Sequence, residues 1–222
     1  MHIKAIIFDL DNTLMDRDTT FRKYSEQLVN DHLGHLDQLT KAEIVADLKI
    51  RDADGYRNKQ AFFEEMAQCL PWKNPLTARE IESYYNTYYM THACKMDYVD
   101  EVLAYCQRQG YLMAIMTNGK HHIQYGKMGL LQLGDQFHTV FVSEDAGMKK
   151  PDQRIYQMAL DKLEVAAENT VFVGDHPRND IWGANQVGIR GIWLRRYHGW
   201  DDSLGIKPWK TIDQLNELIG II

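Results

Sequence analysis

The sequence predicts an α/β protein in which a parallel sheet is flanked by helices and a helical domain is inserted after the first strand. From about residue 95 onward, short apolar runs alternate with stretches of helical periodicity, as they do in consecutive βαβ units. Residues 18–93 show helical periodicity but no convincing strand. We therefore expect a core domain of residues 1–16 and 95–222 and a helical domain of residues 17–94.

The strands of the core are expected where apolar runs are short and bounded by turns. These runs are residues 3–8, 112–117, 140–142, 170–174 and 189–194. Apolar residues at helical spacing predict the helices that connect them. Those helices are expected near residues 98–106, 123–131, 155–163 and 181–187, with a last helix over 211–219. Gly110 and Gly188 stand where two of these helices should end.

The helical domain is expected to contain four helices, each marked by apolar or aromatic residues at helical spacing. The marker residues are Phe21, Tyr24 and Leu28; Ile44, Val45 and Leu48; Phe62, Phe63 and Met66; and Ile81, Tyr84, Tyr85 and Tyr88. Two sequences, Thr40 to Glu43 and Thr77 to Glu80, fit capping boxes at helix starts. The tyrosines over 84–89 could form a binding surface, but aromatic residues at this spacing more often pack inside a helical domain.

Composition excludes several classes of protein. The 222 residues carry a formal net charge of −6, so we expect no nucleic-acid polymer as a partner, because such partners require a basic patch. No apolar stretch approaches the length of a bilayer-spanning helix, and the amino terminus has no signal-peptide layout, so we expect a cytoplasmic protein without a membrane partner. Cys69, Cys94 and Cys106 form no C-x-x-C pair and are expected to be free thiols. The expected assembly is a monomer or homodimer.

The first predicted strand ends in two acids one residue apart, Asp9 and Asp11. A carboxylate at the end of a buried strand is costly unless it is paired or coordinated. Two acids at i and i+2 can hold a divalent cation and present one oxygen as a nucleophile. Because ligands of parallel sheets bind beyond the carboxyl ends of the strands, these two acids are candidates for a functional site.

Further polar residues stand at the ends of other predicted strands or at the start of a helix. They are Thr117 and Asn118, Lys150 before a proline, and Asp175 with Asp180 five residues later. Taken with Asp9-Leu10-Asp11-Asn12-Thr13, the set resembles the four motifs of the haloacid dehalogenase (HAD) superfamily, in order and over the whole chain. The resemblance implies a HAD-like Rossmannoid core, and it implies that the insert over residues 17–94 is a C1-type helical cap of subfamily I.

The resemblance also implies a role for each motif residue. Asp9 would attack phosphorus to form an aspartyl-phosphate, and Asp11 would act as the general acid and base. Thr117 and the backbone amide of Asn118 would hold phosphate oxygens. Lys150 would neutralise the charge that develops during transfer, with Lys149 as its competitor for this role.

The resemblance further implies Mg²⁺ as the cofactor. Its ligands would be Asp9, the backbone carbonyl of Asp11, and Asp175, with Asp180 bound directly or through water. The metal would polarise the phosphoryl group and offset the repulsion between the nucleophile and the incoming phosphate.

The expected function is a magnesium-dependent phosphatase of a small phosphorylated metabolite, a member of the phosphatase branch of the superfamily. Sugar phosphates, phosphoglycolate, nucleoside monophosphates and acyl-sugar phosphates remain open as substrates. A phosphomutase of the β-phosphoglucomutase kind is the main alternative, although Asn12-Thr13 departs from that branch. A non-catalytic phosphate-binding domain is a third reading. Asp11 argues against a dehalogenase, because that branch generally lacks an acid at this position.

Other polar residues have two interpretations. His176 could touch substrate or line the loop after Asp175, and Arg17 could grip an anionic substrate or be a solvated charge. His32 and His35 are expected on the surface. The segment 195–200 is rich in basic and aromatic residues, and its sequence predicts no role.

Overall fold

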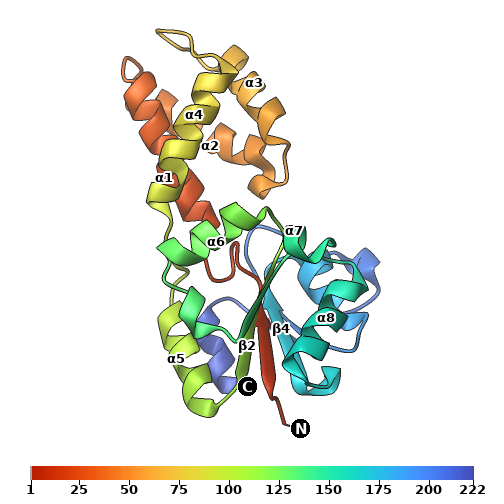
Figure 1. Cartoon of the computed structure of the whole chain (residues 1–222). Coiled ribbons are helices and arrows are strands. Elements are labelled where there is room, and N and C mark those ends of the chain that lie inside the picture. The colour runs from red at the N-terminus through yellow and green to blue at the C-terminus, as the bar shows by residue number, and fades with distance from the viewer. Residues whose placement is uncertain (1) are drawn as a thin grey trace. The chain divides into compact units, whose positions relative to one another are not determined.

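The computed structural model describes residues 2–222, and the chain divides into two compact units (Figure 1). The core unit comprises Met1–Asp16 and Lys95–Ile222, and the helical unit comprises Arg17–Cys94. Among the described residues, no helix combines the length and the apolar character that crossing a bilayer requires. Cys69, Cys94 and Cys106 are free thiols, as expected.

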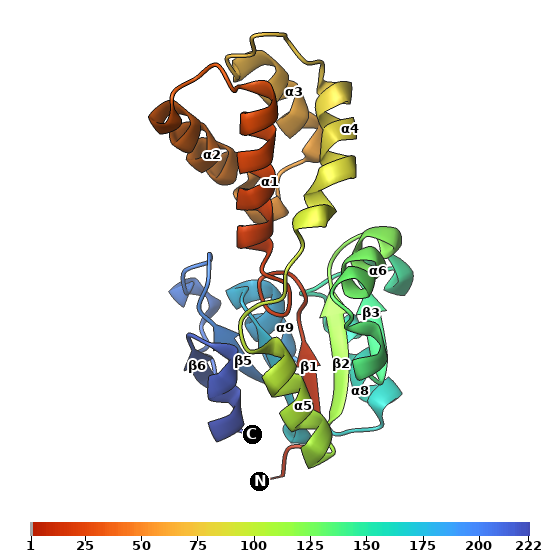
Figure 2. The same ribbon diagram turned by 90° about the vertical axis from the view of Figure 1, so that its left-hand side faces the viewer.

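The core unit is built on a parallel sheet, which for residues 2–222 has six strands in the order β3-β2-β1-β4-β5-β6. In Figure 2 the strands run from β6 on the left to β3 on the right. The strands are β1 (Ala5–Phe8), β2 (Leu112–Thr117), β3 (Thr139–Val142), β4 (Thr170–Gly174), β5 (Arg190–Leu194) and β6 (Lys210–Ile212). The predicted α/β class with a parallel sheet is therefore confirmed.

The order of the strands determines where a ligand can bind. The chain passes from β1 to β2 and β3 on one side, and then returns to place β4 on the other side of β1. The topological switch point thus lies between β1 and β4, and ligands of such sheets bind at the carboxyl ends of these strands. All four residues of β1 are buried, because helices cover both faces of a parallel sheet and leave no polar alternation along its central strand.

Helices cover both faces of this sheet, and Figure 1 shows α5 and α8 on opposite sides of it. The helices are α5 (Val99–Gln109), α6 (His121–Leu130), α7 (Ser143–Ala146), α8 (Gln153–Leu163), a π-helical turn over Pro177–Trp182, and α9 (Gly183–Asn185). The predicted helices near 98–106, 123–131, 155–163 and 181–187 are confirmed. Gly110 follows α5 with a φ of 75°, a left-handed conformation that a glycine adopts without steric cost.

The carboxyl-terminal segment does not form the helix that we expected over residues 211–219. Its first part is strand β6, which pairs with β5, and Leu215–Gly220 form a 3₁₀ helix. The buried residues Ile212, Leu215 and Leu218 repeat every three positions. This spacing suits a 3₁₀ turn as well as an α-helix, and pairing with the edge of β5 satisfies the backbone of the first residues.

The helical unit contains the four predicted helices, which are confirmed as α1 (Arg17–His32), α2 (Gln38–Asp52), α3 (Lys59–Cys69) and α4 (Ala78–Tyr88). The capping box of Thr77 and Glu80 is also confirmed at the start of α4. The capping box expected at Thr40 is wrong, because α2 begins earlier. Its N-cap is Asp37, whose carboxylate accepts hydrogen bonds from the amides of Leu39 and Thr40.

Aromatic side chains form the interior of the helical unit. The ring of Tyr85 lies 5.1 Å from Tyr24, 5.4 Å from Phe63 and 4.6 Å from Tyr89, measured between ring centroids. The tyrosines of α4 therefore pack inside the unit, as their i, i+4 spacing favours.

The surface position expected for His32 is wrong, whereas His35 is exposed. His32 is half-buried, with its ring 5.0 Å from Tyr84 and 6.1 Å from Trp72. It follows Leu28 by four positions in α1 and so shares the buried face of that helix.

Candidate active site

The acids Asp9 and Asp11 lie in a tight turn directly after β1. The backbone amide of Asp9 donates to the carbonyl of Val173 in β4 at 2.9 Å, which holds the residue against the neighbouring strand. Asn12 has a φ of 58°, a left-handed conformation that asparagine tolerates better than most residues. Its amide donates to the carbonyl of Met15 at 2.7 Å. These backbone bonds fix the turn that carries both acids.

Lys150 lies between two buried carboxylates. Its ammonium donates to Asp9 Oδ1 and to Asp180 Oδ1, each at 2.6 Å. The side chains of Lys150 and Asp180 are 3% and 1% exposed, so both partners of this ion pair are buried. Lys149, the competing lysine, is exposed. The structure therefore brings Lys150 together with Asp9 after β1 and with Asp180 after β4.

The side chain of Asn118 anchors Lys150. The amide of Lys150 donates to Asn118 Oδ1 at 2.9 Å, and Asn118 Nδ2 donates to the carbonyl of Lys150 at 3.0 Å. These two bonds tie the backbone of Lys150 to the end of β2. Sequence reasoning considered only the backbone amide of Asn118 and missed this contact, because nothing local in the sequence relates residues 32 positions apart.

Gly174 and His176 shape the loop that carries Asp175 and Asp180. A Cβ on Gly174 would lie 2.4 Å from Asp180 Oδ2, so a glycine is required to leave room for this carboxylate. The same oxygen accepts a hydrogen bond from the amide of His176 at 2.9 Å. The ring of His176 accepts bonds from the amides of Arg178 and Asn179 through Nδ1, each at 3.2 Å. His176 therefore lines the loop and caps the turn that presents Asp180.

The buried carboxylates fit a divalent cation. Oxygens of Asp9, Asp175 and Asp180 lie within 4.8 Å of one another, and all three residues are buried. With Lys150, these groups carry a net charge of −2 when all are ionised, and carboxylate oxygens are the ligands that Mg²⁺ prefers. The side chain of Asp11 is not part of this set.

The pKa values reflect the crowding of charge in this set. Burial raises the pKa of Asp9 to about 7, although the Lys150 ammonium acts in the opposite direction. For Lys150, burial lowers the pKa, but the carboxylates of Asp180 and Asp9 outweigh it and the pKa is raised overall. Lys150 therefore stays charged, and a cation bound beside Asp9 would favour its carboxylate form.

Two residues of α6 that sequence reasoning missed contact Asp11. Lys127 Nζ lies 2.7 Å from both carboxylate oxygens of Asp11. Gln124 Nε2 donates to Asp11 Oδ2 at 3.1 Å and also to the hydroxyl of Thr117. Gln124 and Lys127 are three positions apart and so lie on one face of the helix. The spacing of Gln124 and Lys127 could have indicated that the two side chains act together, but it does not identify Asp11 as the residue that they contact.

Arg17 and the segment 195–200, whose roles the sequence left open, belong to different units. Arg17 is buried and forms ion pairs with Asp52 at 2.6 Å and Asp54 at 3.3 Å inside the helical unit, so it is not a solvated charge. The segment 195–200 belongs to the core unit, and four of its six residues are exposed. The ring of His198 lies 4.5 Å from that of His176, between ring centroids.

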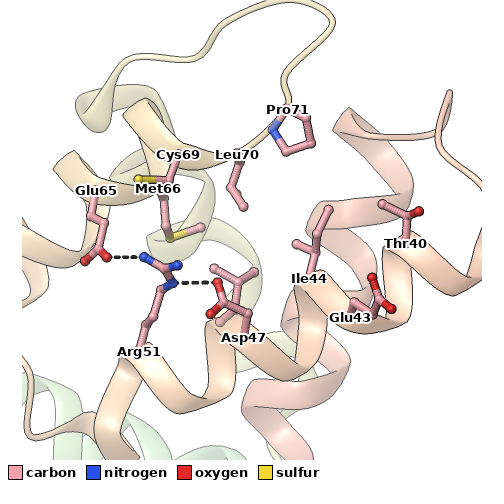
Figure 3. Close-up of a pocket in the computed structure, with 11 residues that line it drawn as sticks. Thr40, Glu43, Ile44, Asp47, Arg51, Glu65, Met66, Cys69, Leu70 and Pro71 are labelled. Atoms are coloured by element: carbon pink, nitrogen blue, oxygen red, sulfur yellow. Dashed lines mark hydrogen bonds and ion pairs between the residues drawn. The ribbon is translucent and has the colours of Figure 1, made fainter.

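Figure 3 shows a pocket of about 270 Å³ that lies entirely within the helical unit, between α2 and the end of α3. The guanidinium of Arg51, which lines this pocket, donates hydrogen bonds to Asp47 at 2.5 Å and to Glu65, whose side chain points toward Arg51 from α3. Arg51, Asp47 and Glu65 are thus paired with one another by hydrogen bonds. The candidate active site is the cluster of acids and Lys150 at the strand ends of the core unit.

Comparisons with known proteins identify the family of the chain. Residues 6–194 match the sequence model of the haloacid dehalogenase-like hydrolases. The chain is 27% identical over 205 residues to a glyceraldehyde 3-phosphate phosphatase of Pyrococcus furiosus, covering 87% of this chain and 81% of that protein. It is 32% identical over 107 residues to the pyrimidine 5'-nucleotidase YjjG of Escherichia coli, covering 48% of this chain and 47% of that protein.

Solved structures share the fold. The HAD-family protein YfnB of Bacillus subtilis, crystallised with magnesium, superposes with a TM-score of 0.76 at 22% identity, over 100% of this chain and 99% of that one. A HAD phosphatase of Thermococcus onnurineus superposes with a TM-score of 0.67 at 23% identity, over 99% of this chain and 97% of that one.

Proposed function

The chain belongs to the haloacid dehalogenase-like hydrolase family as an enzyme of the phosphatase kind, and from this premise we propose that it is a magnesium-dependent phosphatase of a small phosphorylated metabolite. The observation that carries the proposal is the buried group of Asp9, Asp175, Asp180 and Lys150. Three acids and one ammonium gathered at the switch point of the sheet suit both a cation and a phosphoryl group.

Asp9 is the nucleophile in the proposed reaction. One of its oxygens forms a bond to phosphorus while the bond from phosphorus to the leaving oxygen breaks, which yields an aspartyl-phosphate. Asp11 gives its proton to the leaving oxygen. In the second step Asp11 takes a proton from the attacking water, inorganic phosphate departs, and the Asp9 carboxylate is restored. The Lys150 ammonium favours the carboxylate form of Asp9 and neutralises charge on the transferred group.

Thr117 and the backbone amide of Asn118 orient the phosphate. The hydroxyl of Thr117 accepts a hydrogen bond from Gln124, which leaves its own proton to donate to a phosphate oxygen. The side chain of Asn118 holds the backbone of Lys150, so the phosphate-binding segment and the lysine are positioned together.

The side chains of Asp9, Asp175 and Asp180, together with the backbone carbonyl of Asp11, would hold the Mg²⁺ ion. When bound, Mg²⁺ polarises the phosphoryl group and offsets the negative charge of the carboxylates. The presence of magnesium in the structure of YfnB supports this choice of cation.

We assign the role of a C1-type cap to the helical unit, because Arg17–Cys94 is inserted directly after the turn that carries Asp9 and Asp11. A cap excludes water from the reaction, and its opening can limit turnover. The relatives named above act on a triose phosphate and on pyrimidine nucleotides, which supports a small phosphomonoester as the substrate. Because both are phosphomonoesterases by name, hydrolysis is favoured over the phosphomutase alternative.

The test is phosphate release by the purified chain from a panel of phosphorylated metabolites and from p-nitrophenyl phosphate, with Mg²⁺ or with EDTA. We expect release that requires Mg²⁺, that is lost in Asp9→Asn, and that persists in the matched control Asp135→Asn at an exposed site of the core unit. An absence of release from every compound by the wild type would refute the proposal.

A further inference from the structure

We infer that Gln124 and Lys127 of α6 are positioning residues that hold Asp11 in the orientation from which it protonates the leaving group. This inference rests on the proposed phosphatase function, and it concerns two residues outside the four motifs of the family. A general acid must lie within hydrogen-bonding reach of the leaving oxygen. A displacement of about 1 Å is enough to reduce the rate by roughly 10²-fold.

Contacts from α6 hold the side chain of Asp11. The side chain of Asp11 is 25% exposed, so its carboxylate lies at the edge of the buried site. Lys127 Nζ contacts both of its oxygens at 2.7 Å, and Gln124 Nε2 adds a third contact at 3.1 Å. Three contacts from one face of one helix select a single orientation of the carboxylate.

The segment that follows β2 leaves space for the side chain of Gln124. A Cβ on Gly119 would lie 2.8 Å from Cδ and 2.9 Å from Cγ of Gln124, so the glycine makes room for this side chain. Gln124 is 1% exposed and donates to the Thr117 hydroxyl as well as to Asp11. It therefore sets the distance between the residue assigned to the phosphate and the residue assigned to the leaving group.

The burial of Lys127 argues for a role beyond packing. Lys127 is 6% exposed, and desolvating an ammonium is costly even when it is paired. Replacing a whole buried ion pair by apolar residues often leaves stability unchanged or improved, so the pair of Lys127 and Asp11 is weak evidence for a stabilising role alone. A buried lysine directed at the carboxylate of Asp11 is consistent with selection for the placement of that acid. Lys127→Met leaves the carboxylate of Asp11 without this ammonium, but the side chain of Asp11 is 25% exposed and can be hydrated, so we expect the variant to fold.

The experiment compares substrates that do and do not need protonation of the leaving group. The value of kcat/KM covers the steps up to phosphorylation of Asp9. The p-nitrophenolate ion leaves without a proton, whereas the alkoxide of an alkyl phosphate requires one. We expect Lys127→Met and Gln124→Met to lower kcat/KM for an alkyl phosphate about tenfold or more beyond their effect on p-nitrophenyl phosphate. Lys127→Arg should restore most of the alkyl phosphate activity.

The controls separate positioning from stability and from the proposed function itself. Asp11→Asn should show the same substrate dependence to a larger degree, and Lys162→Met, at an exposed lysine of α8, should leave both substrates unchanged. Thermal unfolding identifies any variant that fails to fold, and Gln124→Met provides the second variant. An equal loss on both substrates would mean that α6 acts only on stability.

Three outcomes overturn the inference. An increase in alkyl phosphate activity would mean that Lys127 holds Asp11 away from the reaction. A wild type that is active with an unchanged substrate ratio in the variants would refute the positioning role alone. A wild type that is inactive on all compounds would refute the proposed function and this inference with it.

Discussion

Substituting Gly174 by alanine tests whether the space beside β4 is needed for the position of Asp180. The added Cβ would lie 2.4 Å from Asp180 Oδ2, whereas ordinary contacts begin at 3.4 Å, so the carboxylate must retreat by about 1 Å. A retreat of that size takes its 2.6 Å bond with Lys150 and its 2.9 Å bond with the amide of His176 out of hydrogen-bonding range.

Two effects of Gly174→Ala follow from this displacement. Overpacking of the buried site should lower the free energy of unfolding by about 1–3 kcal/mol. Displacing Asp180 and, through it, Lys150 should lower the rate of phosphate release on the order of 10²-fold. Urea unfolding measures the first effect, and hydrolysis of the best substrate in saturating Mg²⁺ measures the second.

Gly129→Ala is the matched control. A Cβ on this α6 glycine meets nothing within 4 Å, and alanine is the better helix former, so stability should be equal or higher by about 0.5–1 kcal/mol. If Gly174→Ala keeps both the stability and the activity of the wild type, the reasoning that Gly174 is required to seat Asp180 is wrong.

The two remaining predictions concern the charges beside Asp9. In EDTA, the raised pKa of Asp9 means that the folded state binds a proton at this carboxyl group more tightly than the unfolded state does. The protonated Asp9 therefore adds to the free energy of unfolding below pH 4, and this contribution is lost as the pH rises to about 7. Urea unfolding at pH 5 and pH 7 should show this decrease in wild type, and the decrease should shrink in Asp9→Asn or with added Mg²⁺. Lys150→Met leaves the carboxylates of Asp9 and Asp180 without their shared ammonium, so we expect a loss of about 3–5 kcal/mol at pH 7 in EDTA. A loss below about 1 kcal/mol in the same urea assay would contradict that pairing.

Much of the fold could be predicted because local patterns dominate its elements. The fully buried run that forms β1 and the helical periodicity of α1 to α4 each follow from side chains that are close in sequence. Prediction failed where a short pattern suited two structures. The three-residue spacing after Lys210 fits an α-helix and a 3₁₀ helix alike, and pairing with β5 decided the outcome.

The start of α2 shows a second kind of failure. Thr40 and Glu43 match a capping box, but Asp37 also matches an N-cap and begins the helix three residues earlier. Two valid start signals in succession cannot be ranked from sequence alone, because the choice depends on how much of the helix finds packing partners.

The sequence by itself determined the α/β fold, the insertion of the helices after the first strand, and the residues that resemble the HAD motifs, because periodicity and short motifs are local properties of the chain. Only the tertiary structure decided which residues contact one another. Lys150 reaches Asp9 across 141 positions and Lys127 reaches Asp11 across 116. Such contacts depend on the order of the strands and on how each helix turns its faces to the sheet, and these are set by packing of the whole core.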